Sequence, residues 1–166
     1  LSATAHSHPE DRPAFRLKAV LEQVADQYEF ILVDCPPTLG QLTINALSAA
    51  DGVIIPIQCE YLALEGLTQL KNTIDLIVSG LNSKLQIFGI VMTMYDGRTR
   101  LALDVVEEVK QYFPEQIFST VVPRSVRLSE APSHGQSIFE YDPTSRGAQA
   151  YRALSREVEQ RAMAIA

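Results

Sequence analysis

Apolar and polar positions form two kinds of pattern along this chain of 166 residues. Short runs of consecutive apolar residues are typical of strands that are buried on both faces, and apolar residues three or four apart are typical of amphipathic helices. The runs predict strands at 30–33, 53–57, 87–94 and 117–122. The spacing predicts helices near 13–25, 40–50, 64–81, 105–113 and 144–163, and a long loop at 125–142 with at most a short helix.

Strands that alternate with helices predict an α/β fold, with a mainly parallel sheet and helices on both of its faces. Ligands of such sheets bind beyond the carboxyl ends of the strands. Four predicted strands are followed there by polar residues, which are Asp34, Gln58, Asp96 and the pair Pro123–Arg124. We therefore expect these segments to share one rim of the sheet.

Asp34 carries the clearest chemistry of the four, because it ends the apolar run 30–33. A carboxylate at the end of a buried strand is costly unless a charged group lies near it. In nucleotide-binding α/β proteins that group is a magnesium ion with its waters, next to the phosphates. The alternative is that Asp34 caps the turn at Cys35–Pro37, as aspartate often does before proline.

Length and composition narrow the class of protein. We expect one domain over residues 13–166 and a disordered tail or loop over the small, polar residues 1–12. The net charge of -6 excludes a protein coated in positive charge, but it allows a local basic patch. The two cysteines, Cys35 and Cys59, have neither disulfide nor metal spacing, and we expect both to be buried thiols after strands.

No apolar run in the sequence is long enough to span a bilayer, and the first residues lack the pattern of a secretory signal. We therefore expect a cytoplasmic protein.

Three blocks of sequence carry a family resemblance. They are VDCPPTLGQLTINALSAADGVIIPIQCEYLALEGL, MTMYDGRT and VVPRSVRLSEAPSHGQSIFEYDPTSRGAQAY, in this order. From about Phe15 onward the chain resembles the ParA/Soj family of chromosome- and plasmid-partitioning ATPases. The resemblance implies a P-loop NTPase-like fold of the MinD/ParA type. It also implies a homodimer that holds ATP and Mg²⁺, binds nucleoid DNA without reading its sequence, and is stimulated by a ParB/Spo0J-type partner.

The resemblance also implies roles for single residues. Asp34 matches the Walker B carboxylate, which holds magnesium through water. The switch that senses the γ-phosphate matches Pro36, Pro37, Thr38, Leu39 and Gly40. The segment that lines the adenine pocket matches Pro123 and Arg124. The basic positions that hold DNA match Arg98 and Arg127, and guanidinium groups on exposed loops suit such phosphate contacts.

The chain departs from the family in one respect. No Gly-Lys-Ser or Gly-Lys-Thr occurs in it, whereas the family's phosphate-binding loop (Walker A) carries that motif. The resemblance therefore implies a fold that is incomplete at the N-terminus, a chain without catalytic residues of its own, and negligible ATP hydrolysis by it alone. The family's phosphate-loop strand is a neighbour in the sheet, so we expect the run 30–33 to expose an apolar edge and to promote self-association.

Two other functions remain open at this point. One is a non-enzymatic, degenerate homologue that binds DNA or a ParB-like partner without nucleotide. The other is a MinD-like ATPase at the membrane, although the last helix lacks the Lys, Phe and Trp of a membrane-binding helix.

Overall fold

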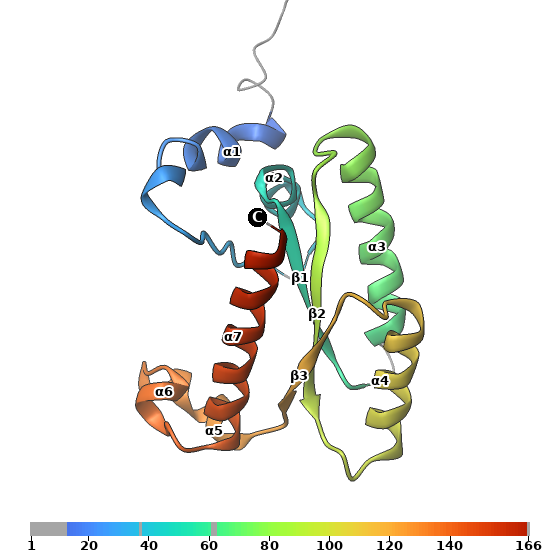
Figure 1. Cartoon of the computed structure of the whole chain (residues 1–166), viewed down its shortest axis with the longest axis vertical. Helices are drawn as coiled ribbons and strands as arrows, with labels where there is room; N and C mark the ends of the chain where they lie inside the picture. The colour runs from blue at the N-terminus through green and yellow to red at the C-terminus, as the bar shows by residue number, and fades with distance from the viewer. Residues whose placement is uncertain (1–12, 37, 61–62, 166) are drawn as a thin grey trace, which may run out of the picture. The chain divides into compact units, whose positions relative to one another are not determined.

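The computed structural model describes residues 13–36, 38–60 and 63–165 (Figure 1). The predicted tail at 1–12 lies outside this part. The chain forms two compact units, the first made of Leu1–Val53 and Thr68–Gln86 and the second of Ile54–Leu67 and Ile87–Ala166. The prediction of a single domain over residues 13–166 stays a prediction.

The elements follow the predicted order of helices and strands, with one strand missing. They are η2 (Pro13–Phe15), α1 (Arg16–Leu21), η3 (Ala25–Gln27), α2 (Gln41–Ala49), β1 (Gly52–Gln58), α3 (Ala63–Gly80), β2 (Gln86–Tyr95), α4 (Arg100–Tyr112), β3 (Ile117–Pro123), α5 (Val126–Glu130), η4 (Ala131–His134), α6 (Ile138–Tyr141) and α7 (Arg146–Ile165). Strands β1, β2 and β3 confirm three of the four predicted strands.

In the first unit, a buried asparagine on α2 holds the beginning of the described chain. The Asn45 Nδ2 donates to the carbonyl oxygens of Pro13 at 2.7 Å and of Gln41 at 3.0 Å, and the Leu17 amide donates to Asn45 Oδ1 at 3.3 Å. This side chain is only 8% exposed, so its amide group satisfies backbone atoms that water does not reach. The predicted helix at 13–25 is shorter in the structure, because α1 ends at Leu21.

The predicted strand at 30–33 is wrong. The segment has no regular secondary structure and pairs with none of the described strands. Phe30, Ile31, Leu32 and Val33 are 44, 38, 83 and 41% exposed. Its amides donate no hydrogen bond to any other described residue. A strand gains its stability from neighbouring strands, and an apolar run without such a neighbour remains unpaired.

The second unit contains a parallel sheet of three strands in the order β1-β2-β3. Strands β2 and β3 pair in parallel, but their register changes twice, between Ile90 and Met92 and again between Met92 and Tyr95. The second change adds one residue to β2 at the position where Met94 has a φ of 53°. A left-handed residue of this kind is typical of a β-bulge.

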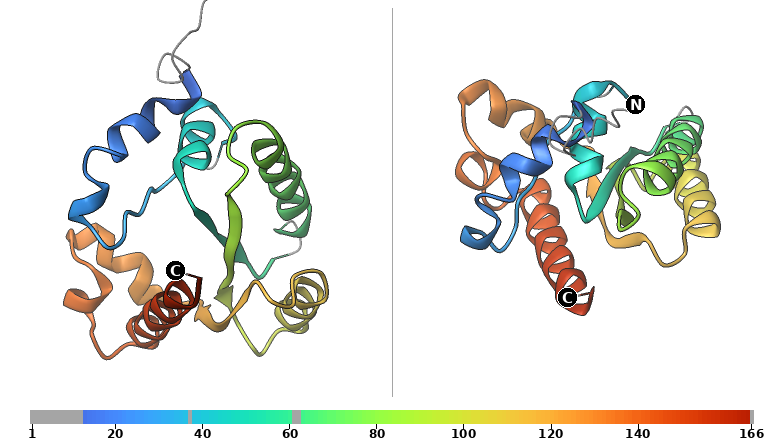
Figure 2. Two further views of the ribbon diagram at one scale, coloured as in Figure 1. Left: turned by 45° about the horizontal axis from the view of Figure 1, so that its top comes forward. Right: turned by 90° about the horizontal axis from the view of Figure 1, so that it is seen from above.

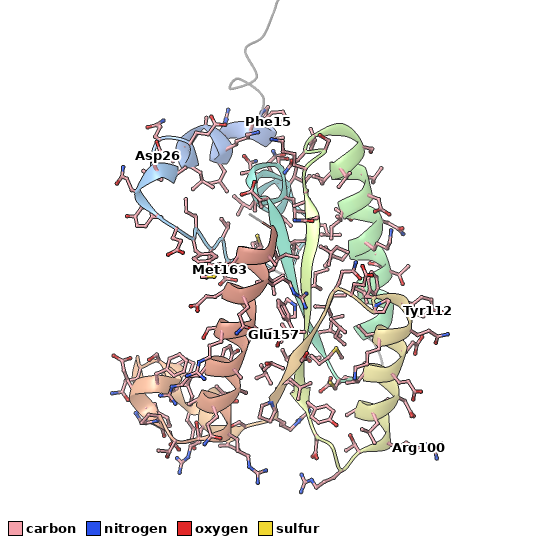
Figure 3. The ribbon with its side chains drawn as sticks, viewed as in Figure 1. Phe15, Asp26, Arg100, Tyr112, Glu157 and Met163 are labelled. Atoms are coloured by element: carbon pink, nitrogen blue, oxygen red, sulfur yellow. The ribbon has the colours of Figure 1, made fainter. Side chains whose placement is uncertain are left out.

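Helix α7 packs along β3, which is an edge strand (Figures 1 and 3). The Glu157 carboxylate, on the side of α7 toward β3, accepts from the amides of Ser119 at 2.6 Å and Thr120 at 2.9 Å. Consecutive amides of a regular strand point in opposite directions, so this pair depends on the irregular register of β3. Arg161 donates to the carbonyl oxygens of Phe88 and Gln116 at 2.9 and 2.8 Å. Glu157 thus satisfies two amides on the edge strand. Arg161 joins β2 to the residue before β3, where the Gln116 carbonyl oxygen also accepts from the Ile90 amide at 2.9 Å.

The core of the second unit lies where α7 covers the sheet. Its buried members are Val91, Phe118 and Val122, and Ile54, Phe88, Leu128, Leu154 and Val158 pack against them. Gly89 makes room for Phe118, because a Cβ at Gly89 would lie 2.2 Å from the Phe118 ring. Helix α4 lies on the opposite side of the sheet from α7 (Figure 2). The fold class predicted from the sequence, a parallel sheet with helices on both faces, is confirmed.

The segment 125–142 is more ordered than the predicted loop, because α5, η4 and α6 occupy most of it. The Ser137 hydroxyl and amide both lie 2.9 Å from the Glu140 carboxylate in a capping box that begins α6. Ala131, Ile138 and Ala148 form a small buried cluster beneath these helices. Local caps and a few apolar contacts therefore order a segment that has no long apolar pattern.

None of the described helices combines the length and the hydrophobicity that a membrane span requires.

Candidate functional site

In the second unit, the segments that follow β1, β2 and β3 meet at one edge of the sheet. The Arg124 amide donates to the Tyr95 carbonyl oxygen at 3.0 Å, which extends the pairing of β2 and β3 by one residue. The Arg124 guanidinium, through Nη2, contacts Glu60 Oε1 at 2.9 Å. The sequence placed Arg124 at this rim, but it did not indicate Glu60 as its partner, because 64 residues separate the two.

Asp96 and Arg98 form the tightest ion pair of this rim. The Arg98 Nε and Nη2 donate to the two carboxylate oxygens of Asp96 at 2.9 and 2.7 Å, and the Arg98 amide donates to Oδ1 at 3.1 Å. These bonds from Arg98 lower the pKa of Asp96 from 3.8 to about 2, and the charge of Arg124 adds to the shift. The Arg98 side chain is 89% exposed, so the guanidinium lies at the surface and remains accessible to a ligand.

Arg127, on the short helix α5, lies between two carboxylates. Its Nη1 is 3.0 Å from Glu130 Oε2 and its Nε is 3.5 Å from Asp142 Oδ2. The Tyr141 hydroxyl donates to the same Glu130 oxygen at 3.1 Å, and the His134 ring stacks on Tyr141 with centroids 5.0 Å apart. The hydrogen bond to Glu130 raises the pKa of Arg127, so the guanidinium stays charged.

The sequence missed the acidic partners of this group. The spacing of Arg127 and Glu130, three apart, is a signal that could have found one of them if a helix had been predicted there. Asp142 carries no such local signal, since 15 residues of chain separate it from Arg127.

In the first unit, Asp34 lies in an extended segment at the wall of an open groove with a volume of about 520 Å³. The wall is mostly apolar and includes Arg16, Leu17, Val20, Asp34, Leu42 and Asn45. Asp34 itself is exposed, so the expectation that it ends a buried strand is wrong. The cost of burying its charge therefore does not arise, and the structural argument for a charged neighbour no longer holds.

The predicted switch residues lie just after Asp34 in the chain. Pro36 lines the groove, and Pro37 lies outside the described residues. The Thr43 hydroxyl donates to the Thr38 carbonyl oxygen at 2.6 Å. Gly40 is the N-cap of α2 and has an extended backbone. These contacts connect the segment to the first turn of α2.

The two cysteines differ. Cys59 is buried, as predicted, and burial raises the pKa of its thiol. Cys35 is exposed, because the run before it is no strand, and the prediction of burial is wrong there. Partial desolvation and the neighbouring charge of Asp34 raise the pKa of the Cys35 thiol.

A magnesium ion would find few protein ligands here. No group of three or more His, Cys, Asp or Glu side chains in the described part of the chain could hold a metal. Magnesium keeps most of its waters and binds proteins through one or two carboxylates together with phosphates. The single exposed carboxylate of Asp34 fits a contact through water, with phosphate oxygens supplying the other ligands.

Comparison with known proteins gives the family. The profile of the AAA domain family matches residues 3–87. The chain belongs to this family. Among curated relatives, the sporulation initiation inhibitor protein Soj of Bacillus subtilis is 58% identical over 86% of the chain. The chromosome partitioning protein ParA of Myxococcus xanthus is 54% identical over 92% of the chain. The resemblance to Soj and ParA is thereby confirmed.

The solved structures agree with this AAA domain assignment. The septum site-determining protein MinD of Pyrococcus horikoshii, in complex with Mg-ADP, has a TM-score of 0.72 and 26% identity. The match covers 91% of this chain and 58% of that one. The chain spans about half the length of its relatives, since it covers 56% of Soj and 54% of ParA.

Proposed function

We propose that this chain is part of a chromosome-partitioning ATPase of the Soj/ParA type and that it supplies the surface that holds DNA. The identity to Soj of 58% carries this proposal. In the intact protein, an ATP-dependent homodimer binds nucleoid DNA without reading its sequence, and a ParB-type partner stimulates hydrolysis. Such a protein works in the cytoplasm, on the nucleoid.

Two arginines are proposed to contact the DNA backbone. The side chains of Arg98 and Arg127 are 89 and 55% exposed, and both belong to the second unit. Phosphate contacts by such groups give affinity that falls steeply with salt and does not depend on sequence. The net charge of -6 confines this affinity to a local surface.

The nucleotide-binding roles are proposed for other residues. Asp34 would hold Mg²⁺ through water, and Pro36, Thr38 and Gly40 would belong to the γ-phosphate switch. Pro123 and Arg124 would line the adenine pocket. When bound, ATP and Mg²⁺ supply the γ-phosphoryl group and neutralise its charge. MinD bound to Mg-ADP shares the fold, which supports this assignment.

DNA binding is tested with the chain itself and a labelled duplex of arbitrary sequence. We expect fluorescence anisotropy to show binding that weakens with salt. Arg98→Ala and Arg127→Ala should each weaken it severalfold, because each removes one phosphate contact. Arg156→Ala is the matched control, since Arg156 is an exposed arginine on α7 outside the rim. Equal losses in all three variants would contradict the assigned surface.

A non-enzymatic binding module is the second candidate. The 166 residues contain no Gly-Lys-Ser or Gly-Lys-Thr, and phosphoryl transfer depends on the loop that carries this motif, so these residues by themselves would act only by binding. We expect negligible ATP hydrolysis by the purified chain, measured as phosphate release. Salt-dependent DNA binding that ATP does not change would favour the module, and hydrolysis at rates typical of an ATPase would exclude it.

A further inference from the structure

Both arginines of the proposed DNA surface, and Arg124 of the proposed adenine pocket, are paired with carboxylates. Arg98 contacts Asp96, Arg124 contacts Glu60, and Arg127 contacts both Glu130 and Asp142. A group of one arginine and one acid is neutral, and the group around Arg127 has one more negative than positive charge. Among the described residues, these pairings therefore reduce the net positive charge that Arg98 and Arg127 present to DNA.

The group around Arg127 leaves little of the guanidinium for a new ligand. Glu130 accepts a hydrogen bond from Nη1, and Asp142 lies 3.5 Å from Nε in a longer ion pair, on a different edge of the planar group. A phosphate that binds Arg127 in a bidentate manner must displace at least one of the two carboxylates. Glu130 is also held by the Tyr141 hydroxyl, so the acid stays in place when the arginine leaves.

We propose that Glu130 and Asp142 compete with DNA phosphates for Arg127 and thereby set the affinity of this surface for DNA. The proposal rests on the DNA-binding function proposed above and adds its regulation. Whatever removes the negative charge of these acids, or draws them to another cation, strengthens DNA binding.

The expected gain in DNA affinity follows from the exposure of the three charged side chains. The side chains of Arg127, Glu130 and Asp142 are 55, 37 and 29% exposed, so water screens the ion pairs and phosphate can replace them. A single negative charge a few ångströms from a phosphate costs about a factor of three to ten in affinity at low salt. Removal of one acid should recover about this factor.

The test uses amide variants, which remove charge but keep an oxygen that accepts hydrogen bonds. Glu130→Gln and Asp142→Asn are compared with the unchanged chain by anisotropy of a labelled DNA duplex at two salt concentrations. Glu107→Gln is the matched control, because it removes the same charge from an exposed position on α4. Circular dichroism and thermal unfolding of each variant establish that it is folded.

We expect threefold to tenfold tighter binding for Glu130→Gln and for Asp142→Asn, and less than twofold for Glu107→Gln. The gain should shrink at high salt and should vanish when Arg127→Ala is added to Asp142→Asn. A gain that survives Arg127→Ala would overturn the proposal, since it would arise from net charge alone.

The outcomes separate this proposal from the proposed function. Binding by the unchanged chain with no gain in the amide variants overturns the competition and leaves the DNA-binding function intact. Binding by the amide variants alone supports the competition, because the acids then suppress binding completely. No binding by any of these proteins contradicts both.

Discussion

Two apolar runs of the same kind have opposite fates in this protein. The run Phe30–Val33 is extended, unpaired and exposed, whereas β3 is paired with β2 and covered by α7. Hydrophobicity does not account for the difference, because both runs are strongly apolar. The difference lies in the hydrogen-bonding partners. Strand β3 pairs with β2 on one edge, while Glu157 accepts from two of its amides and Arg161 donates to its Ile117 carbonyl oxygen. An apolar sequence becomes a strand only where hydrogen-bonding partners exist for it.

Hydrogen exchange should show the largest contrast between the two runs. The amides of β3 are bonded within the core of the second unit, so they should exchange only by global unfolding. The amides of 30–33 should exchange almost as fast as those of an unfolded chain. We expect a difference of about 5 kcal/mol or more in the free energy of opening, measured by mass spectrometry or NMR. Similar protection in both runs would mean that 30–33 pairs in solution.

The next largest effect is expected from truncation of Phe118, the buried aromatic residue of the core. Phe118 is 1% exposed, lies 6.4 Å from the Phe88 ring centroid, and carries the Arg161 guanidinium 4.3 Å from its own centroid. Phe118→Ala should lower the free energy of unfolding by about 3 to 5 kcal/mol, because it removes buried area and leaves a cavity. Urea unfolding followed by circular dichroism measures this loss. Phe30→Ala, at an apolar side chain that is 44% exposed, serves as the control and should lose much less.

A substitution at Glu157 tests how much the contact between α7 and the edge strand β3 contributes to stability. Partial burial raises the pKa of Glu157, but the amides of Ser119 and Thr120 lower it more, so the net pKa lies below the ordinary 4.5. Its stabilisation is therefore complete above about pH 4.5 and is lost as the pH falls through the lowered value. Glu157→Gln should lower the free energy of unfolding by about 1 kcal/mol at pH 7, a small value because water screens this partly exposed carboxylate.

The pH dependence gives the decisive control for this variant. Between pH 6 and pH 3, Glu157→Gln should lose less stability than the unchanged chain, because the group that titrates is gone. Parallel curves for the two proteins would show that Glu157 does not hold β3 through its charge.

The smallest expected effect on stability is at Leu32, which is 83% exposed. Leu32→Ser should change the free energy of unfolding by less than about 0.5 kcal/mol, as substitutions at exposed positions do. It should nevertheless reduce self-association, since an exposed apolar run with unpaired backbone groups recruits other chains. Light scattering after size exclusion measures the association. A monodisperse monomer before the substitution would contradict the predicted role of this run.

The sequence correctly predicted the strands whose hydrogen-bonding neighbours belong to the described residues. The three strands, the helices around them and the parallel order of the sheet were predicted from the spacing of apolar residues and from the alternation of strands and helices. The run 30–33 could not be assigned from its own composition, because its state depends on a neighbour that periodicity does not reveal. The short helices at 126–141 were missed for the opposite reason: caps such as Ser137–Glu140 order them without a long apolar pattern.

The candidate site was predicted in part. The sequence indicated which arginines follow the strands, and the structure places Arg98, Arg124 and Arg127 in the second unit, while Asp34 belongs to the first. The sequence indicated Asp96, which pairs with Arg98, but not Glu60 or Asp142, because these two acids are distant in sequence from their arginine partners. The roles proposed for Asp34, Pro123 and the other site residues remain predictions.

The extra residue in β2, at Met94, has a consequence for the evolution of this rim. Side chains alternate from one surface of a strand to the other, so one inserted residue exchanges the surfaces for everything that follows it before the turn. Tyr95, the next residue, therefore takes the place opposite Pro123 that Met94 would have in a regular strand. Deletion of Met94 should therefore leave Tyr95 paired with Pro123 and the rim residues in place, because it removes the extra residue and not a paired one.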